Sequence, residues 1–187
     1  MALPQERLYT IEDIYALPEG TRAELIDGQL YMMAPPTRRH QEIVGELYTS
    51  ISNYIKSKGG SCKPYIAPFA VFLNADNKNY IEPDISVICD RNKLTDRGCD
   101  GVPDWVIEVV SPGSRRTDYY TKLFKYRTAG VREYWIVDPG NRSVQVFLLD
   151  EMGALRLRED YGREDIAKVN VLDGCFIELS KVFPAGD

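Results

Sequence analysis

Apolar residues recur at helical spacing in two long stretches of the chain. They predict an amphipathic helix over residues 39–58, which Gly59 and Gly60 end, and a second helix over residues 117–129. A shorter helix is predicted over residues 10–17, where a threonine is followed three residues later by an acid, as in a capping box. These helices are long enough to cover the faces of a sheet.

Short apolar runs bounded by turn residues predict the strands. They cover a hairpin over residues 23–33 and single strands over residues 67–73, 81–88, 105–110, 133–138 and 143–149. The strand–helix–strand order from residue 105 to residue 137 favours a parallel pair with a right-handed crossover. Residues 90–100 are expected to be a charged loop, and the last forty or so residues to be short strands with a brief terminal helix.

The predicted fold class is therefore α/β (α+β), with a mixed central β-sheet flanked by helices. No linker or repeat divides the sequence, so residues 1–187 are expected to form one domain. A hydrophobic content of 44% and a charged content of 27% are ordinary for a globular protein. No apolar run reaches the roughly 20 residues of a membrane span, and residues 1–6 lack a signal-peptide pattern. We therefore expect a cytoplasmic protein with no membrane partner.

Cysteine and charge content exclude some kinds of site. The four cysteines are scattered and accompanied by a single histidine, so neither a zinc site nor a disulfide framework is expected. A net charge of −5 argues against indiscriminate binding to nucleic acid. Basic residues nevertheless gather just after the strand over residues 105–110, at Arg115, Arg116, Lys122, Lys125 and Arg127. This group is read either as a solvated helix face or as a local surface for phosphate.

The apolar run over residues 105–110 contains one acid, Glu108. A buried carboxylate is costly, so Glu108 needs a metal cation, a pair with Arg115 or Arg116, or a bound proton. Asp84 lies in the strand over residues 81–88. If the two strands are neighbours, Asp84 and Glu108 can converge on one cation, and oxygen ligands are those that Mg²⁺ prefers.

Lys122 is the basic residue that helical geometry brings nearest to these acids. At about 100° per residue, it lies on the margin of an apolar stripe marked by Tyr119, Tyr120 and Leu123, while Lys125 lies further round, away from the stripe. From that margin an ammonium group can position an attacking water and stabilise developing negative charge. Taken alone, Lys122 would be read as a solvated side chain and Asp84 as a turn acid.

Several motifs together resemble a known family. They are Pro83-Asp84, PDWVIEVVSP at 103–112, RRTD at 115–118 with Lys122, and GVREYWIVDP at 130–139, supported by ELIDG at 24–28 and RHQ at 39–41. This set is similar to the Uma-two family, which is grouped with restriction endonucleases in the PD-(D/E)XK nuclease superfamily. The resemblance covers nearly the whole chain and implies a restriction-endonuclease-like core.

The resemblance also implies roles for individual residues. Asp84 and Glu108 match the metal-binding acids of the superfamily, and Glu24 matches a further family acid near the start of the core. Val110 stands where the motif usually has lysine, and Lys122 matches the lysine that the family takes from the following helix. These matches predict a catalytic set of acids and one lysine.

His40 is the single histidine of the chain, and it opens the predicted helix over residues 39–58. A histidine there is ordinarily a surface or capping residue, whereas the resemblance favours one that faces the site. Arg115, Arg116 and Lys125 are the candidate contacts to nucleic acid.

The predicted function is a Mg²⁺-dependent endonuclease, in which Mn²⁺ can substitute, acting on phosphodiester bonds in DNA as a homodimer. The alternative is a non-catalytic nucleic-acid-binding or assembly module that keeps the nuclease fold. The acid–acid–lysine set favours the enzyme. The acidic net charge favours the module, or a nuclease that needs a partner subunit to grip nucleic acid.

Overall fold

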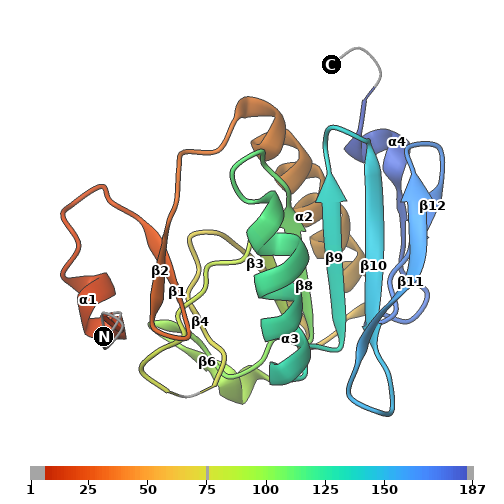
Figure 1. Cartoon of the computed structure of the whole chain (residues 1–187). Helices are drawn as coiled ribbons and strands as arrows, with labels where there is room; N and C mark the ends of the chain where they lie inside the picture. The colour runs from red at the N-terminus through yellow and green to blue at the C-terminus, as the bar shows by residue number, and fades with distance from the viewer. Residues whose placement is uncertain (1–6, 75, 185–187) are drawn as a thin grey trace.

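The computed structural model describes residues 7–74 and 76–184, so the N-terminal segment in which a signal pattern was sought lies outside the described residues. A six-stranded mixed sheet forms the centre of the molecule, with strand order β11-β10-β9-β8-β5-β3 (Figure 1). Its strands are β3 (Lys63–Ile66), β5 (Ile85–Ile88), β8 (Trp105–Val109), β9 (Glu133–Asp138), β10 (Ser143–Leu149) and β11 (Leu155–Gly162). The predicted mixed sheet is confirmed.

The pairing directions follow from the connections between the strands. β8 and β9 are joined through a helical segment and pair in parallel, as the strand–helix–strand order predicted. β9 and β10 form an antiparallel hairpin, and β5 pairs antiparallel with β8 on the other side. The apolar strand β8 thus lies in the middle of the sheet, where every one of its residues is buried.

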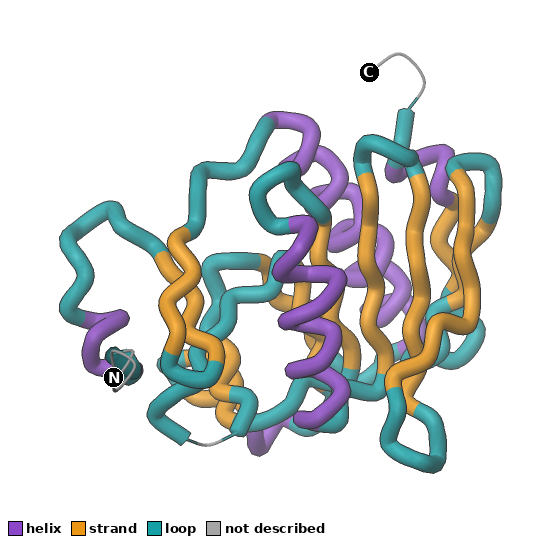
Figure 2. Tube along the Cα trace, viewed as in Figure 1, coloured by secondary structure: helices purple, strands orange, loops and turns teal. Residues whose placement is uncertain are grey.

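Helices cover both faces of this sheet (Figure 2). Helix α2 (Arg38–Lys58) packs Ile43, Leu47 and Ile51 against the face that carries Trp105 and Ile107. The other face is covered by a π-helix, η2 (Thr117–Lys122), that continues into α3 (Leu123–Ala129). Two hydrophobic cores result, one on each side of β8, because alternate strand residues point to opposite faces.

The inner face of the η2–α3 helix differs from the predicted apolar stripe. Tyr120 was assigned to that stripe but is 72% exposed, whereas Lys122 is buried rather than marginal. Lys125 was placed away from the stripe and is also buried. The physical reason is the π-helical turn, which closes i→i+5 hydrogen bonds and therefore shifts side chains from the angles of an α-helix.

Smaller elements surround the sheet. They are α1 (Ile11–Tyr15), the hairpin β1 (Ala23–Ile26) and β2 (Gln29–Met32), β4 (Val71–Phe72), η1 (Arg91–Lys93), β6 (Leu94–Thr95), β7 (Gly98–Asp100), β12 (Ile166–Lys168), β13 (Phe176–Glu178) and α4 (Leu179–Val182). The strand predicted over residues 67–73 is wrong except at its end, because Pro68 cannot donate to a ladder and only β4 forms there. The loop predicted over residues 90–100 contains η1 and the β6–β7 hairpin.

Two cysteines correct an expectation from the sequence. Cys62 and Cys89 form a disulfide with Cα atoms 3.8 Å apart, although no disulfide framework was expected. The cause is tertiary: β3 pairs with β5 so that Lys63 faces Ile88, and the flanking cysteines become neighbours across 27 residues of sequence. Cys99 and Cys175 are buried free thiols. None of the helices in the described chain is long and apolar enough to span a membrane.

Candidate active site

The pairing of β5 with β8 brings two of the predicted site acids together. Ile85 faces Ile107 across the two strands, and extending this register by one residue places Asp84 opposite Glu108. The backbone amide of Val109 donates to Asp84 Oδ2 at 2.7 Å, which ties the acid to β8. Directly opposed residues on adjacent strands have side chains in reach of each other. The geometry therefore allows Asp84 and Glu108 to share a ligand.

Lys122 extends from the end of η2 into the same region. Its Nζ lies 2.9 Å from Glu108 Oε1 and 2.9 Å from Glu24 Oε1. Asp118, one helical turn earlier, has Oδ1 at 3.7 Å from Nζ. All four side chains are buried. We call Glu24, Glu108 and Asp118 the acid cluster; Lys122 sits at its centre.

Other groups hold the acid cluster in place. The Tyr126 hydroxyl donates to Glu108 Oε1 at 2.7 Å, and the backbone amide of Glu82 donates to Glu24 Oε1 at 3.0 Å. Asp118 Oδ1 has no hydrogen-bond partner within the described part of the chain. The sequence placed Asp118 within the RRTD motif but gave it no site role, although its position four residues before Lys122 is a signal that could have indicated one.

His40 faces Asp84 from the first turn of α2. Its Nε2 lies 3.2 Å from Asp84 Oδ2, while its backbone amide donates to Thr37 Oγ1 in the helix cap. The side chains of both His40 and Asp84 are partly exposed, in contrast to the acid cluster. His40 is thus a residue of the helix start whose ring points to a predicted site acid.

Burial and charge set the protonation of the cluster. Burial raises the pKa of Glu108 well above its ordinary value; Lys122 opposes this rise, and the charges of Asp118, Asp84 and Glu24 add to it. For Lys122, burial lowers the pKa, but the charges of Glu108, Glu24 and Asp118 outweigh burial and hold it well above its ordinary value. Lys122 is therefore protonated, and its single positive charge does not compensate all of the surrounding carboxylates.

The same balance acts on His40. Burial lowers its pKa, yet the hydrogen bond to Asp84 and the Asp84 charge, with smaller contributions from the Val109 backbone and Asp118, leave the pKa above its ordinary value. The imidazolium form is favoured because a carboxylate accepts a hydrogen bond from it.

The carboxylate oxygens of the four site acids are the kind of ligand that a hard divalent cation prefers. Glu24, Asp84, Glu108 and Asp118 offer only oxygen ligands, and one Asp118 oxygen is buried without a partner. Within residues 7–74 and 76–184, however, no three His, Cys, Asp or Glu side chains are already arranged around a point that could hold a metal ion. The position at which Glu24 and Glu108 converge is taken by the ammonium of Lys122.

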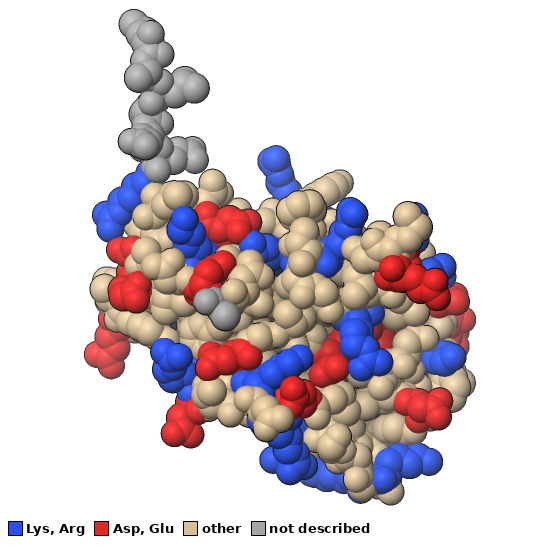
Figure 3. All heavy atoms as spheres, turned by 90° about the horizontal axis from the view of Figure 1, so that it is seen from below, with Lys and Arg blue, Asp and Glu red and all other residues tan. Residues whose placement is uncertain are grey.

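The three basic residues predicted to contact nucleic acid differ in exposure. Arg115 and Arg116 are exposed in the segment after β8, and Arg115 pairs with Asp138 at 2.5 Å. Lys125 is buried and ion-paired with Asp27, so its assignment to the outer helix face is wrong. The face seen in Figure 3 carries interspersed acidic and basic side chains rather than a surface of one sign.

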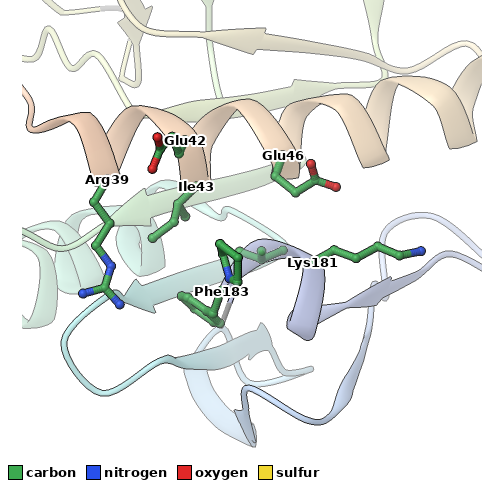
Figure 4. A pocket seen from close by; sticks show the side chains of 8 residues that line it. Arg39, Glu42, Ile43, Glu46, Lys181 and Phe183 are labelled. Carbon is green, nitrogen blue, oxygen red and sulfur yellow. The ribbon is translucent and has the colours of Figure 1, made fainter. Parts of the chain in front are cut away.

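A cavity of about 350 Å³ lies between α2 and α4, apart from the acid cluster. Arg39, Glu42, Glu46 and Lys181 border it, and Phe183 closes its floor (Figure 4). None of the predicted site residues lines it. Its mixed charges give no preference for an anionic or a cationic ligand.

Comparisons with known proteins give a matching family model, a relative and a structure of similar fold. Residues 11–180 match the family model Uma2, described as "Putative restriction endonuclease". An uncharacterized protein from Synechocystis sp. (strain ATCC 27184 / PCC 6803 / Kazusa) is 26% identical over 131 residues, which is 70% of this chain and 67% of that protein. A crystal structure from Anabaena variabilis ATCC 29413, described as a "putative nuclease belonging to DUF820", has a TM-score of 0.72 at 19% identity. That alignment covers 93% of this chain and 97% of the other, and it shows a shared fold.

Proposed function

The chain belongs to the Uma2 family, and on that premise we propose that it is a Mg²⁺-dependent endonuclease that cleaves phosphodiester bonds in DNA. Asp84 and Glu108 hold the cation, and Mn²⁺ can replace Mg²⁺. The observation that carries the proposal is the antiparallel pairing of β5 with β8, which sets these two acids opposite each other with Lys122 hydrogen-bonded to Glu108.

The proposed chemistry assigns a task to each side chain. A bound Mg²⁺ supplies an activated water and neutralises charge on the phosphoryl group. Lys122 supplies a positive charge to the reacting phosphate, and its raised pKa keeps that charge at neutral pH. Tyr126 orients Glu108 through its hydroxyl, and His40 orients Asp84 through Nε2.

DNA is the proposed substrate because the family is described as "Putative restriction endonuclease" and exposed arginines follow β8 in the chain. Arg115 and Arg116 are both exposed and come directly after the loop that follows β8. Arginine pairs well with phosphate oxygens. The net charge of −5 favours such local contacts over a broad basic surface.

We also propose that residues 1–187 act as one nuclease domain and that two copies assemble as a homodimer. A duplex has two strands to cut, and a two-fold dimer presents one equivalent site to each strand.

One observation favours the second candidate, a non-catalytic module. In the acid cluster, Lys122 is buried and is already ion-paired with Glu24 and Glu108, as in a structural ion pair. In a module of that kind the cluster stabilises the fold and no bond is broken.

Cleavage of supercoiled plasmid and of labelled single-stranded DNA separates the two candidates. The wild type should cut in Mg²⁺ and not in EDTA, and Asp84→Asn and Glu108→Gln should each abolish cutting. Glu133→Gln is the matched control, since Glu133 is a buried acid that accepts hydrogen bonds from Trp135 and Val171 outside the cluster. If the wild type and all three variants bind DNA and none of them cuts it, the non-catalytic module is favoured.

A further inference from the structure

The ammonium of Lys122 is surrounded by carboxylates in the way that a bound metal cation would be. Its ammonium is surrounded by Glu24 and Glu108 at 2.9 Å and by Asp118 at 3.7 Å. These three carboxylates come from β1, β8 and η2, so distant parts of the chain approach one ammonium. With the lysine in place, they do not form a ready-made metal site among the described residues. Carboxylate oxygens from separate elements are typical ligands of a hard divalent cation.

The ammonium satisfies this cluster incompletely. Asp118 is 2% exposed, and its Oδ1 has no hydrogen-bond partner within the described part of the chain, although it is directed at Nζ. An unpaired buried carboxylate oxygen costs free energy. A lysine donates three hydrogen bonds, whereas Mg²⁺ or Mn²⁺ takes about six oxygen ligands and can engage all three acids.

The net charge of the acid cluster also favours a divalent cation over the lysine. The acid cluster holds three carboxyl groups against one ammonium, and Asp84 adds a fourth acid nearby. A divalent cation in the position of Nζ would compensate one more negative charge than the lysine does.

Glu24 makes joint occupancy difficult. Lys122 Nζ lies 2.9 Å from both of its oxygens, and one of them also accepts the Glu82 amide. Glu24 therefore keeps at most one free lone pair, on Oε2, while the lysine stays. A cation that binds both oxygens of Glu24 must take the place of the ammonium.

Building on the proposed function, we propose that the Lys122 ammonium and a divalent cation are alternative occupants of the acid cluster. The cation assigned to Asp84 and Glu108 gains Glu24 and Asp118 as further ligands once the lysine has left, and the expelled lysine becomes available to substrate phosphate. Asp118 and Lys122 both lie on η2, whose π-helical turn is a form frequently found at functional sites. In the metal-free protein, the Lys122 side chain is therefore buried and not available to substrate.

Lysine footprinting of the wild-type protein tests the exchange directly. The protein is treated briefly with acetic anhydride in Mn²⁺ or in sodium chloride of equal ionic strength, and modification of each lysine is measured by mass spectrometry. Lys122 should be protected in sodium chloride and become several-fold more reactive when Mn²⁺ saturates the protein. Lys125 is the matched control, because it is equally buried but paired with Asp27 outside the cluster, and its reactivity should not change.

Calorimetric titration of Mn²⁺ without nucleic acid separates failure of this inference from failure of the proposed function. Asp118→Asn should weaken Mn²⁺ binding several-fold, since it removes a ligand. Mn²⁺ binding that leaves Lys122 protected would overturn the exchange and leave a metal site at Asp84 and Glu108 intact. If no Mn²⁺ binds to the folded wild type, both the exchange and the proposed metal dependence are wrong. Equal exposure of Lys122 and Lys125 would indicate general loosening and would also overturn the exchange.

Discussion

Replacing Lys122 with methionine should destabilise the metal-free protein severely. Lys122→Met keeps the length of the side chain but removes the ammonium that contacts Glu24 and Glu108 in the interior. Breaking a buried ion pair from one side costs about 3–5 kcal/mol, because the remaining charge is uncompensated. Uptake of a proton by Glu108, whose pKa is already raised, brings the cost toward the lower end of that range.

Thermal unfolding followed by circular dichroism in EDTA at neutral pH measures this loss. For a chain of this size, about 1 kcal/mol corresponds to roughly 2–4 °C, so a fall of about 6–20 °C in Tm is expected. Lys181→Met is the control, because the Lys181–Glu178 pair is exposed and such pairs contribute about 0–1 kcal/mol.

The sign of the pH dependence gives a second check on Lys122→Met. A carboxyl group with a raised pKa in the folded state stabilises the fold at low pH, and that contribution is lost as pH rises through the folded pKa. The deficit of Lys122→Met should therefore shrink on acidification. A fall in Tm no larger than that of Lys181→Met, or a deficit that grows on acidification, would refute the account of the cluster.

Three further outcomes are expected. Glu108→Gln should change Tm little, since Lys122 keeps Glu24 and Asp118 as partners, and Mg²⁺ should raise the Tm of the wild type much more than that of the variant. A large loss of stability would show that Glu108 is the main partner of the lysine. Nuclear magnetic resonance titration of His40 should give a pKa above the ordinary value, and Asp84→Asn should bring it below that value because burial remains. An unchanged His40 pKa in that variant would exclude the Asp84 interaction. Sedimentation at micromolar concentration should give a dimer, and a species of only 21.3 kDa would contradict it.

Local patterns were sufficient to predict the main elements of the fold. The apolar run around Glu108, the long helix over residues 39–58 and the Asp27-Gly28 hairpin all appear close to where they were predicted. Each depends on short-range periodicity or turn chemistry, which is visible in the sequence. The pairing of β5 with β8 was stated as a condition and is present.

Features that depend on tertiary contact or unusual winding could not be predicted. The Cys62–Cys89 disulfide results from the register of β3 against β5. The burial of Lys125 follows from the π-helical turn before it and from its pairing with Asp27. The sequence indicated Glu24 and Glu108 of the acid cluster and also Lys122. It could not indicate that Lys122 is buried among these acids, since that burial depends on β1, β8 and η2 meeting in the fold.

Anomalous diffraction from crystals soaked in Mn²⁺ tests the central claim, that the buried acids of this chain form a divalent cation site. The account predicts an anomalous peak within coordination distance of a Glu108 carboxylate oxygen, and the loss of that peak in Glu108→Gln crystals. A peak distant from both Asp84 and Glu108, or none at a concentration that saturates binding in solution, would contradict it.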